Sequence, residues 1–128
     1  MDNLKIKATK SSPEISFDYE NNTLEITGKS YPANIEEFYT PVFFWLKKYL
    51  SQLESQKVTV NVELIYFNSS TSMVLMAFFE NLEGAVSNGK NIFINWICEE
   101  DDDDTLEYGE EFQEDFEKLE FNFVQKSV

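Results

Sequence analysis

Residues 57 to 67 read KVTVNVELIYF, and this stretch decides the fold. Valine alternates with polar residues in its first half and the second half is continuously apolar, which predicts a central strand covered on both faces. From about Ser70 to Val86 the apolar residues recur every three or four positions, which predicts a helix. Asn91 to Cys98, NIFINWIC, predicts a further buried strand. If the two strands lie parallel, they form one right-handed βαβ unit with the helix between them.

A β-hairpin is predicted upstream of this unit. Glu14 to Ile26 contains two short alternating runs around the sequence Glu20-Asn21-Asn22. This pattern is typical of a hairpin, because Asn tolerates the positive φ that tight turns require. The hairpin therefore adds two strands before the βαβ unit.

A long amphipathic helix is predicted between the hairpin and residue 57. It runs from about Ile35 to Leu53, and Asn34 with Glu37 gives it a capping-box-like start. Pro41 lies inside this helix, and because proline lacks a backbone donor we expect it to kink or loosen the turn. Three large aromatic residues, FFW at positions 43 to 45, cannot all face inward on one helix, so one or two are expected to be exposed.

The C-terminal part begins with six consecutive acidic residues, Glu99 to Asp104, which we expect to form a solvated and mobile acidic loop. A helix-like stretch rich in Glu follows, and Phe121 to Val124 can form a last edge strand. The predicted order is ββαβαβα with this additional β at the end. Such alternation indicates a single α/β domain, residues 1–128, in which helices cover a mixed β-sheet.

The composition excludes several classes of function. With 24 acidic and 10 basic residues and a formal net charge of −14, the chain is not expected to bind nucleic acid or an anionic membrane surface. It contains no His and only one Cys, Cys98, which excludes Ser-His-Asp catalysis, Cys-His catalysis and thiolate zinc sites. No signal-peptide core or membrane span is visible, so we expect a cytoplasmic protein without a cofactor.

The acidic run offers an alternative function, a divalent-cation or small-ligand binding module. Hard cations prefer carboxylate oxygens, and the candidate ligands are Asp101, Asp102, Asp103 and Asp104. These residues lack the spaced ligands and the central Gly of an EF-hand loop. An enzyme that uses paired carboxylates is a third alternative, although nothing in the linear spacing demands it.

Four hydroxyl residues, Ser69 to Ser72, stand between the central strand and the following helix in the sequence YFNSSTS. Ser and Thr cap helices by accepting hydrogen bonds from first-turn N–H groups, but capping explains one or two hydroxyls and not four. A phosphoryl group at this position would meet unpaired N–H donors and the positive end of the helix dipole. A phosphorylation switch is therefore a second hypothesis beside capping.

Three segments of the chain resemble the SiaC family of bacterial regulatory phosphoproteins. They are FDYENNTLEITGKSYPAN at 17 to 34, YFNSSTS at 66 to 72 and LEYGEEF at 106 to 112, of which SYPAN and YFNSSTS are the most specific parts. The resemblance implies a fold similar to the STAS domains of anti-sigma-factor antagonists. It also implies that the phosphoacceptor is Ser69, directly after Asn68. Other available hydroxyls, to which we assign the capping role, are Ser70, Thr71 and Ser72.

The same resemblance implies a non-enzymatic signalling protein of a partner-switching pathway. A serine/threonine kinase would phosphorylate it, and a PP2C-type phosphatase would reverse the modification. The unphosphorylated form would bind and activate a downstream target such as a diguanylate cyclase.

Overall fold

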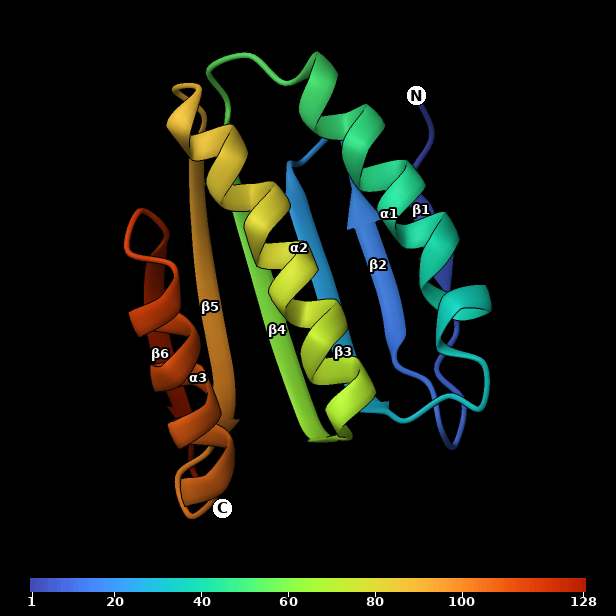
Figure 1. Cartoon of the computed structure of the whole chain (residues 1–128), viewed down its shortest axis with the longest axis vertical. Coiled ribbons are helices and arrows are strands. Elements are labelled where there is room, and N and C mark those ends of the chain that lie inside the picture. The colour runs from blue at the N-terminus through green and yellow to red at the C-terminus, as the bar shows by residue number, and fades with distance from the viewer.

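The computed structural model describes the whole chain, residues 1–128, as one sheet with three helices (Figure 1). The elements are β1 (Leu4–Ile6), β2 (Glu14–Asp18), β3 (Thr23–Ser30), α1 (Ile35–Gln52), β4 (Lys57–Phe67), α2 (Ser69–Ser87), β5 (Asn91–Glu99), α3 (Asp103–Asp115) and β6 (Glu120–Lys126). The sheet order is β1-β2-β3-β4-β5-β6. The first two strand pairs are antiparallel and the other three are parallel, so the predicted mixed α/β fold is confirmed.

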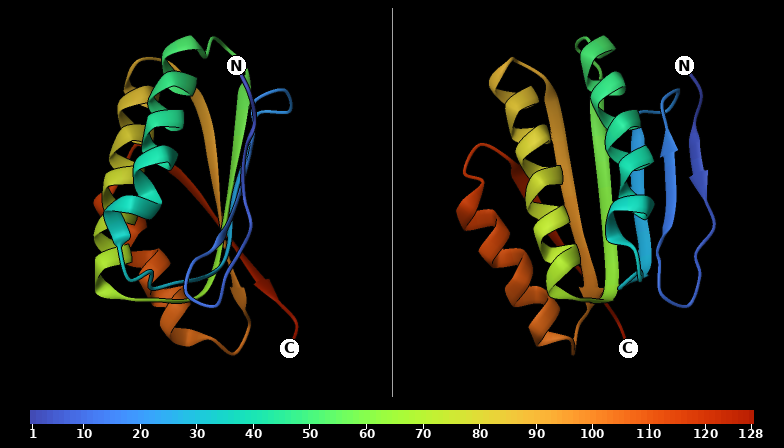
Figure 2. Two further views of the ribbon diagram at one scale, coloured as in Figure 1. Left: turned by 90° about the vertical axis from the view of Figure 1, so that its right-hand side faces the viewer. Right: turned by 45° about the vertical axis from the view of Figure 1, so that its right-hand side comes forward.

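The molecule has two layers, because all three helices lie on one face of the sheet and leave the other face open (Figure 2). Residues of β4 alternate between buried and half-buried as far as Leu64. The prediction that this strand is covered on both faces is therefore wrong. Its apolar end reaches solvent instead, with Ile65 55% and Tyr66 53% exposed.

None of the three helices has the length and apolar character that a membrane span requires.

Three strand-to-helix junctions lie at one edge of the sheet. β4 and β5 are parallel with α2 between them, as predicted. β3 leads into α1, β4 into α2 and β5 into α3, all at the lower end of Figure 1. Functional sites of α/β folds form at the carboxyl ends of parallel strands, so this edge is where a site is expected.

Aromatic side chains attach α3 to the sheet. The Phe79 ring of α2 lies 5.1 Å from the ring centre of Phe112 and 5.3 Å from that of Phe121. The indole of Trp96 packs 5.5 Å from Phe112, and its Nε1 donates a 2.8 Å hydrogen bond to the carbonyl of Thr105. Aromatic pairs at such distances add stability beyond the area that they bury, so α3 is a firmly packed part of the fold.

The open face of the sheet carries a row of hydrogen-bonded side chains across four strands. Asn122 donates to Asn95 over 3.0 Å, Asn95 to Asn61 over 2.8 Å, and Asn61 to the Glu25 carboxylate over 3.1 Å. These residues are register partners in neighbouring strands. A slip of one residue would turn a member of the row to the other face, so the row fixes the register of the parallel strands.

The short strand β1 is absent from the sequence prediction. It has three residues, too few to show an alternating pattern. Contacts distant in sequence hold it in place: Trp45 Nε1 donates to the carbonyl of Asp2 over 2.7 Å, and the Tyr19 amide donates to Asn3 Oδ1 over 3.0 Å. The N-terminal segment is therefore part of the sheet.

Pro41 does not end α1, which continues to Gln52. The proline lies on the exposed side of the helix, where the carbonyl that loses its N–H partner is close to solvent. The predicted exposure within the FFW sequence is confirmed, since Trp45 is buried, Phe43 is half-buried and Phe44 is 74% exposed.

Candidate functional site

The candidate site is the junction between β4 and α2, and Asn68 caps the helix there. Asn68 Oδ1 accepts a 3.0 Å hydrogen bond from the Thr71 amide, and the Asn68 carbonyl accepts one of 3.0 Å from the Ser72 amide. The prediction that Ser70, Thr71 and Ser72 provide the cap is therefore wrong. Asn is as good an N-cap as Ser, and Asn68 occupies the position immediately before the helix.

The four hydroxyl residues occupy different environments. Thr71 is fully buried, whereas Ser69 and Ser70 are exposed and Ser72 is half-buried. A modifying enzyme can reach an exposed hydroxyl, so burial removes Thr71 as a phosphoacceptor. Ser69, the predicted acceptor, is the first residue of the helix.

A buried chain of hydroxyl groups connects this junction to β3 and α1. Thr71 Oγ1 donates to the Ser30 carbonyl over 2.9 Å and lies 2.8 Å from Ser30 Oγ, which lies 2.7 Å from the Tyr39 hydroxyl. Each hydroxyl has one proton, and Thr71 uses its own on the carbonyl. The chain therefore runs in one direction, with Tyr39 donating to Ser30 Oγ and Ser30 donating to Thr71 Oγ1.

Burial keeps the chain neutral. It raises the pKa of Tyr39 to about 12, against the opposing effect of the hydrogen bond with Ser30. No buried side-chain nitrogen or oxygen lacks a hydrogen-bond partner. A buried network in which every group is satisfied is rigid, so the first turn of α2 is held firmly beneath the exposed Ser69.

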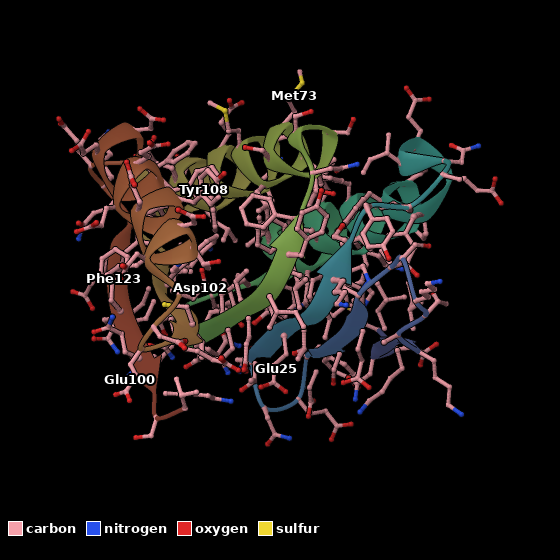
Figure 3. The ribbon with its side chains drawn as sticks, turned by 90° about the horizontal axis from the view of Figure 1, so that it is seen from below. Glu25, Met73, Glu100, Asp102, Tyr108 and Phe123 are labelled. Atoms are coloured by element: carbon pink, nitrogen blue, oxygen red, sulfur yellow. The ribbon has the colours of Figure 1, made fainter.

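Exposed apolar side chains follow Ser69 along α2 and lie on the neighbouring helix α3. Met73, 73% exposed, lies one turn after Ser69 on the same side of α2. Tyr66 is also exposed, but it precedes Phe67, which packs on Trp96, so its side chain points to the open face of the sheet, away from α2. Tyr108 of α3 (labelled with Met73 in Figure 3) is also exposed. Its ring centre lies 5.3 Å from that of Phe67. We call Met73, Met76 and Tyr108 the apolar rim. Exposed apolar side chains that cluster in this way mark an interaction surface.

The predicted acidic loop is only partly a loop. Glu99 ends β5, and α3 begins at Asp103. Asp102 is the N-cap of α3 and accepts hydrogen bonds from the amide (3.1 Å) and the hydroxyl (2.7 Å) of Thr105. Six acids in a row include a good N-cap residue and a favourable acidic first turn, which is why the helix begins within the run.

The candidate cation ligands Asp101, Asp102, Asp103 and Asp104 do not form a metal site. No group of three or more His, Cys, Asp or Glu side chains in the chain is arranged to hold a metal ion. Cys98, which precedes these acids, is buried, and burial together with the charge of Asp102 raises the pKa of its thiol. A raised pKa keeps the thiol protonated and unreactive.

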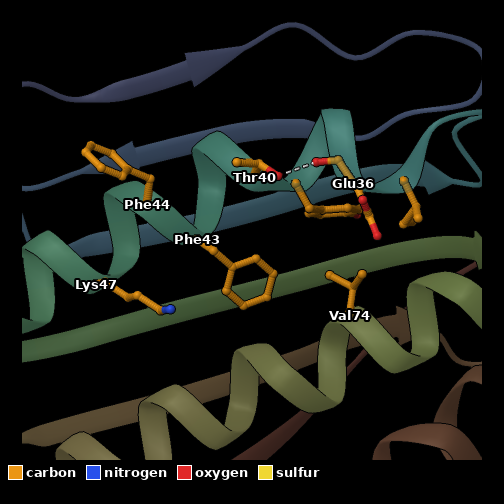
Figure 4. Close-up of a pocket in the computed structure, with 8 residues that line it drawn as sticks. Glu36, Thr40, Phe43, Phe44, Lys47 and Val74 are labelled. Atoms are coloured by element: carbon orange, nitrogen blue, oxygen red, sulfur yellow. Dashed lines mark hydrogen bonds between the residues drawn. The ribbon is translucent and has the colours of Figure 1, made fainter.

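A hollow lies between α1 and α2 (Figure 4). Phe43 of α1 and Val74 of α2 face each other across it, and Tyr39 connects it to the buried hydroxyl chain. Tyr39 belongs to the predicted apolar pattern of α1, but its bond to Ser30 was not predicted, because the two residues come from different elements and only the fold brings their hydroxyls together. The SYPAN segment, which begins at Ser30, was the signal that could have indicated them.

Comparisons with known proteins agree with this geometry. Residues 6–126 match the model of the SiaC family, described as SiaC family regulatory phosphoprotein. An uncharacterized protein of Pseudomonas aeruginosa strain UCBPP-PA14 is 30% identical over 115 residues, which cover 90% of each chain.

Solved structures with a similar fold are also members of the SiaC family. Apo-SiaC from Pseudomonas aeruginosa superposes with a TM-score of 0.88 at 29% identity, over 97% of this chain and 99% of that one. This chain is also similar to a chain in the crystal structure of the diguanylate cyclase SiaD in complex with its activator SiaC from Pseudomonas aeruginosa. The TM-score is 0.86 at 28% identity, over 98% of this chain and 99% of that one. The predicted family and fold are thereby confirmed, and the description of the family supports the predicted regulatory, non-enzymatic protein. The chain belongs to the SiaC family of regulatory phosphoproteins.

Proposed function

We propose that the chain is a switch protein of a bacterial partner-switching pathway, controlled by reversible phosphorylation of Ser69. In this proposal the unphosphorylated form binds and activates a partner protein such as a diguanylate cyclase. The observation that carries the proposal is the position of Ser69, which is exposed on the first turn of α2 beside the apolar rim.

The helix start would tolerate a phosphoryl group on Ser69. The amides of Ser69 and Ser70 have no acceptor within the helix, because they belong to its first turn. The helix dipole also favours negative charge at this end. Phosphorylation is therefore expected to leave the fold intact, as a reversible switch requires.

The same group would weaken binding of a partner to the apolar rim. Phosphorylation adds a charge of about −2, and burying it in an interface without a basic partner costs several kcal/mol. The chain contains no Arg, and the segment from Ile65 to Glu80 contains no Lys. The neighbouring strand β3 carries Lys29, the register partner of Tyr66, but it precedes Ser30, which faces the helices, so its side chain points to the open face away from α2. The charge of the phosphoryl group would therefore remain exposed to the partner.

Partners of three kinds are part of the proposal. A serine/threonine kinase and a PP2C-type phosphatase set the phosphorylation state, and a downstream target reads it. Support for a diguanylate cyclase as the target comes from the solved complex of SiaD with its activator SiaC, since that SiaC has the fold of this chain.

The acceptor assignment is tested by intact-mass spectrometry after incubation with the cognate kinase. Wild type and Ser70→Ala should each gain one phosphoryl group, whereas Ser69→Ala should gain none. Ser70→Ala is the matched control, because Ser70 is also exposed and one residue away. An undiminished gain in Ser69→Ala would overturn the assignment to Ser69.

The effect on binding is tested with Ser69→Asp and a diguanylate cyclase related to SiaD from the same organism. We expect Ser69→Asp to weaken binding by about 100-fold, because a desolvated carboxylate costs several kcal/mol, whereas Ser69→Ala should bind like wild type. Titration calorimetry measures both affinities. Ser69→Asn is the control for size, since it resembles Asp without the charge. If Ser69→Asp and Ser69→Asn lost the same amount of affinity, the partner would be responding to the size of the side chain and not to its charge.

A further inference from the structure

The outer side of α1 is a stripe of exposed residues that no element of the chain covers. Its members recur every three or four positions, so they lie along one side of the helix. The largest is Phe44, which is 74% exposed. We call this set the α1 stripe; it consists of Glu36, Glu37, Thr40, Pro41, Phe44, Lys47 and Lys48.

The charges of the α1 stripe are ordered along the helix, with two acids near its start and two lysines near its end. The helix dipole explains Glu36 and Glu37, which lie in the first turn. It does not explain Lys47 and Lys48, because the last turn of α1 contains no basic residue and the dipole acts mainly within that turn. None of the four charges forms an ion pair within the chain, whose one salt bridge joins Lys126 to Glu63.

Two shallow hollows flank Phe44, one on each side of α1. The hollow toward α2 is lined by Phe43 and Val74 (Figure 4), and the hollow toward the N-terminal segment is lined by Met1 and Leu4. Thr40 and Phe44 border both hollows. The surface therefore has both a projecting aromatic side chain, Phe44, and apolar hollows into which the aromatic side chain of another molecule could fit.

We propose that the α1 stripe is the interface of a homodimer, in which α1 packs antiparallel against its copy across a twofold axis near Val42. In such a pair a residue that lies a given number of positions before Val42 faces the residue of the other chain that lies the same number of positions after Val42. Glu36 then faces Lys48 of the copy and Glu37 faces Lys47. Thr40 faces Phe44, so each phenyl ring packs where the two hollows of the other chain meet. The stripe is thus complementary to itself, as a twofold interface requires.

The overall charge of the protein also favours this surface over others. Two chains with a net charge of −14 repel each other, but the α1 stripe carries two acids and two bases and is therefore neutral. A single pair of helices is at the small end of protein interfaces, so the dimer is weak, with a dissociation constant of roughly 10 μM to 1 mM. This dimer does not depend on the proposed switch, because Ser69 lies on α2.

Sedimentation equilibrium of four forms of the full chain tests the proposal. Wild type should dimerise, and two half-reversed variants should not: Glu36→Lys/Glu37→Lys makes the stripe wholly basic, and Lys47→Glu/Lys48→Glu makes it wholly acidic. The two half-reversed variants should associate when they are mixed. The fourth form reverses all four charges, which keeps the stripe complementary to itself, and it should dimerise like wild type.

Two further measurements decide the outcome. Phe44→Ala should abolish dimerisation while its circular dichroism spectrum stays that of wild type, since Phe44 is exposed. If one half-reversed variant fails to fold, the other and Phe44→Ala still test the interface. Wild type that remains monomeric at about 1 mM overturns the proposal. So does a dimer that is equally strong in every variant, because such a dimer would use another surface.

Discussion

Replacing Gly109 by alanine is expected to lower the free energy of unfolding by about 2 kcal/mol. A Cβ at position 109 would lie 2.4 Å from Cδ1, 2.5 Å from Nε1 and 2.8 Å from Cγ of Trp96. The indole cannot move away easily, because it is 1% exposed and its Nε1 is bonded to the Thr105 carbonyl. The substitution therefore has to push α3 away from β5, and this loss exceeds the roughly 1 kcal/mol that alanine gains over glycine in a helix.

Gly84→Ala is the matched control for this prediction. Gly84 also lies inside a helix, α2, but a Cβ there would have nothing within 4 Å. The substitution should raise the free energy of unfolding by about 1 kcal/mol. Urea denaturation of the two variants and wild type measures the contrast of about 3 kcal/mol. If both variants were stabilised alike, the contact between Gly109 and Trp96 would not be as close as described.

Local patterns were sufficient to predict most of the sheet. Alternation in Lys57–Phe67 and periodicity in Ser69–Ser87 gave β4 and α2 nearly to their ends, because each element buries one regular set of side chains. Burial on the second face of β4 could not be predicted in the same way. Ile65 is exposed, and Tyr66 packs its ring 5.6 Å from that of Tyr31 while it stays half exposed, and a run of apolar residues cannot distinguish such side chains from buried ones.

The site was predicted in position but not in its internal roles. The sequence placed the hydroxyls at the start of a helix, and the chain does place Ser69 there. It could not show that Asn68 is the cap or that Thr71 is buried. The hydrogen-bond partner of Thr71 is Ser30, which is 41 residues earlier in the chain, so only the tertiary fold brings the two together.

Replacing Thr71 by valine is expected to lower the free energy of unfolding by about 2 kcal/mol. Valine has nearly the shape of threonine, so no cavity forms, but the Ser30 carbonyl loses its hydroxyl donor and Ser30 Oγ loses its acceptor. Both groups are buried, and a buried polar group without a partner costs about 1–3 kcal/mol. The Ser30 carbonyl keeps one hydrogen bond, from the Asn68 amide at 3.2 Å, which limits the loss.

Neighbouring hydroxyls provide the control for Thr71. Ser70→Ala removes an exposed hydroxyl one residue away and should change the free energy of unfolding by no more than about 0.5 kcal/mol. Tyr39→Phe removes the other end of the hydroxyl chain, so the double variant with Thr71→Val should depart from additivity by about 0.5 kcal/mol or more. Thermal and urea unfolding of the single and double variants measure this coupling. Strict additivity would mean that Tyr39, Ser30 and Thr71 do not act as one network, and that α1 is not coupled through them to the turn that carries Ser69.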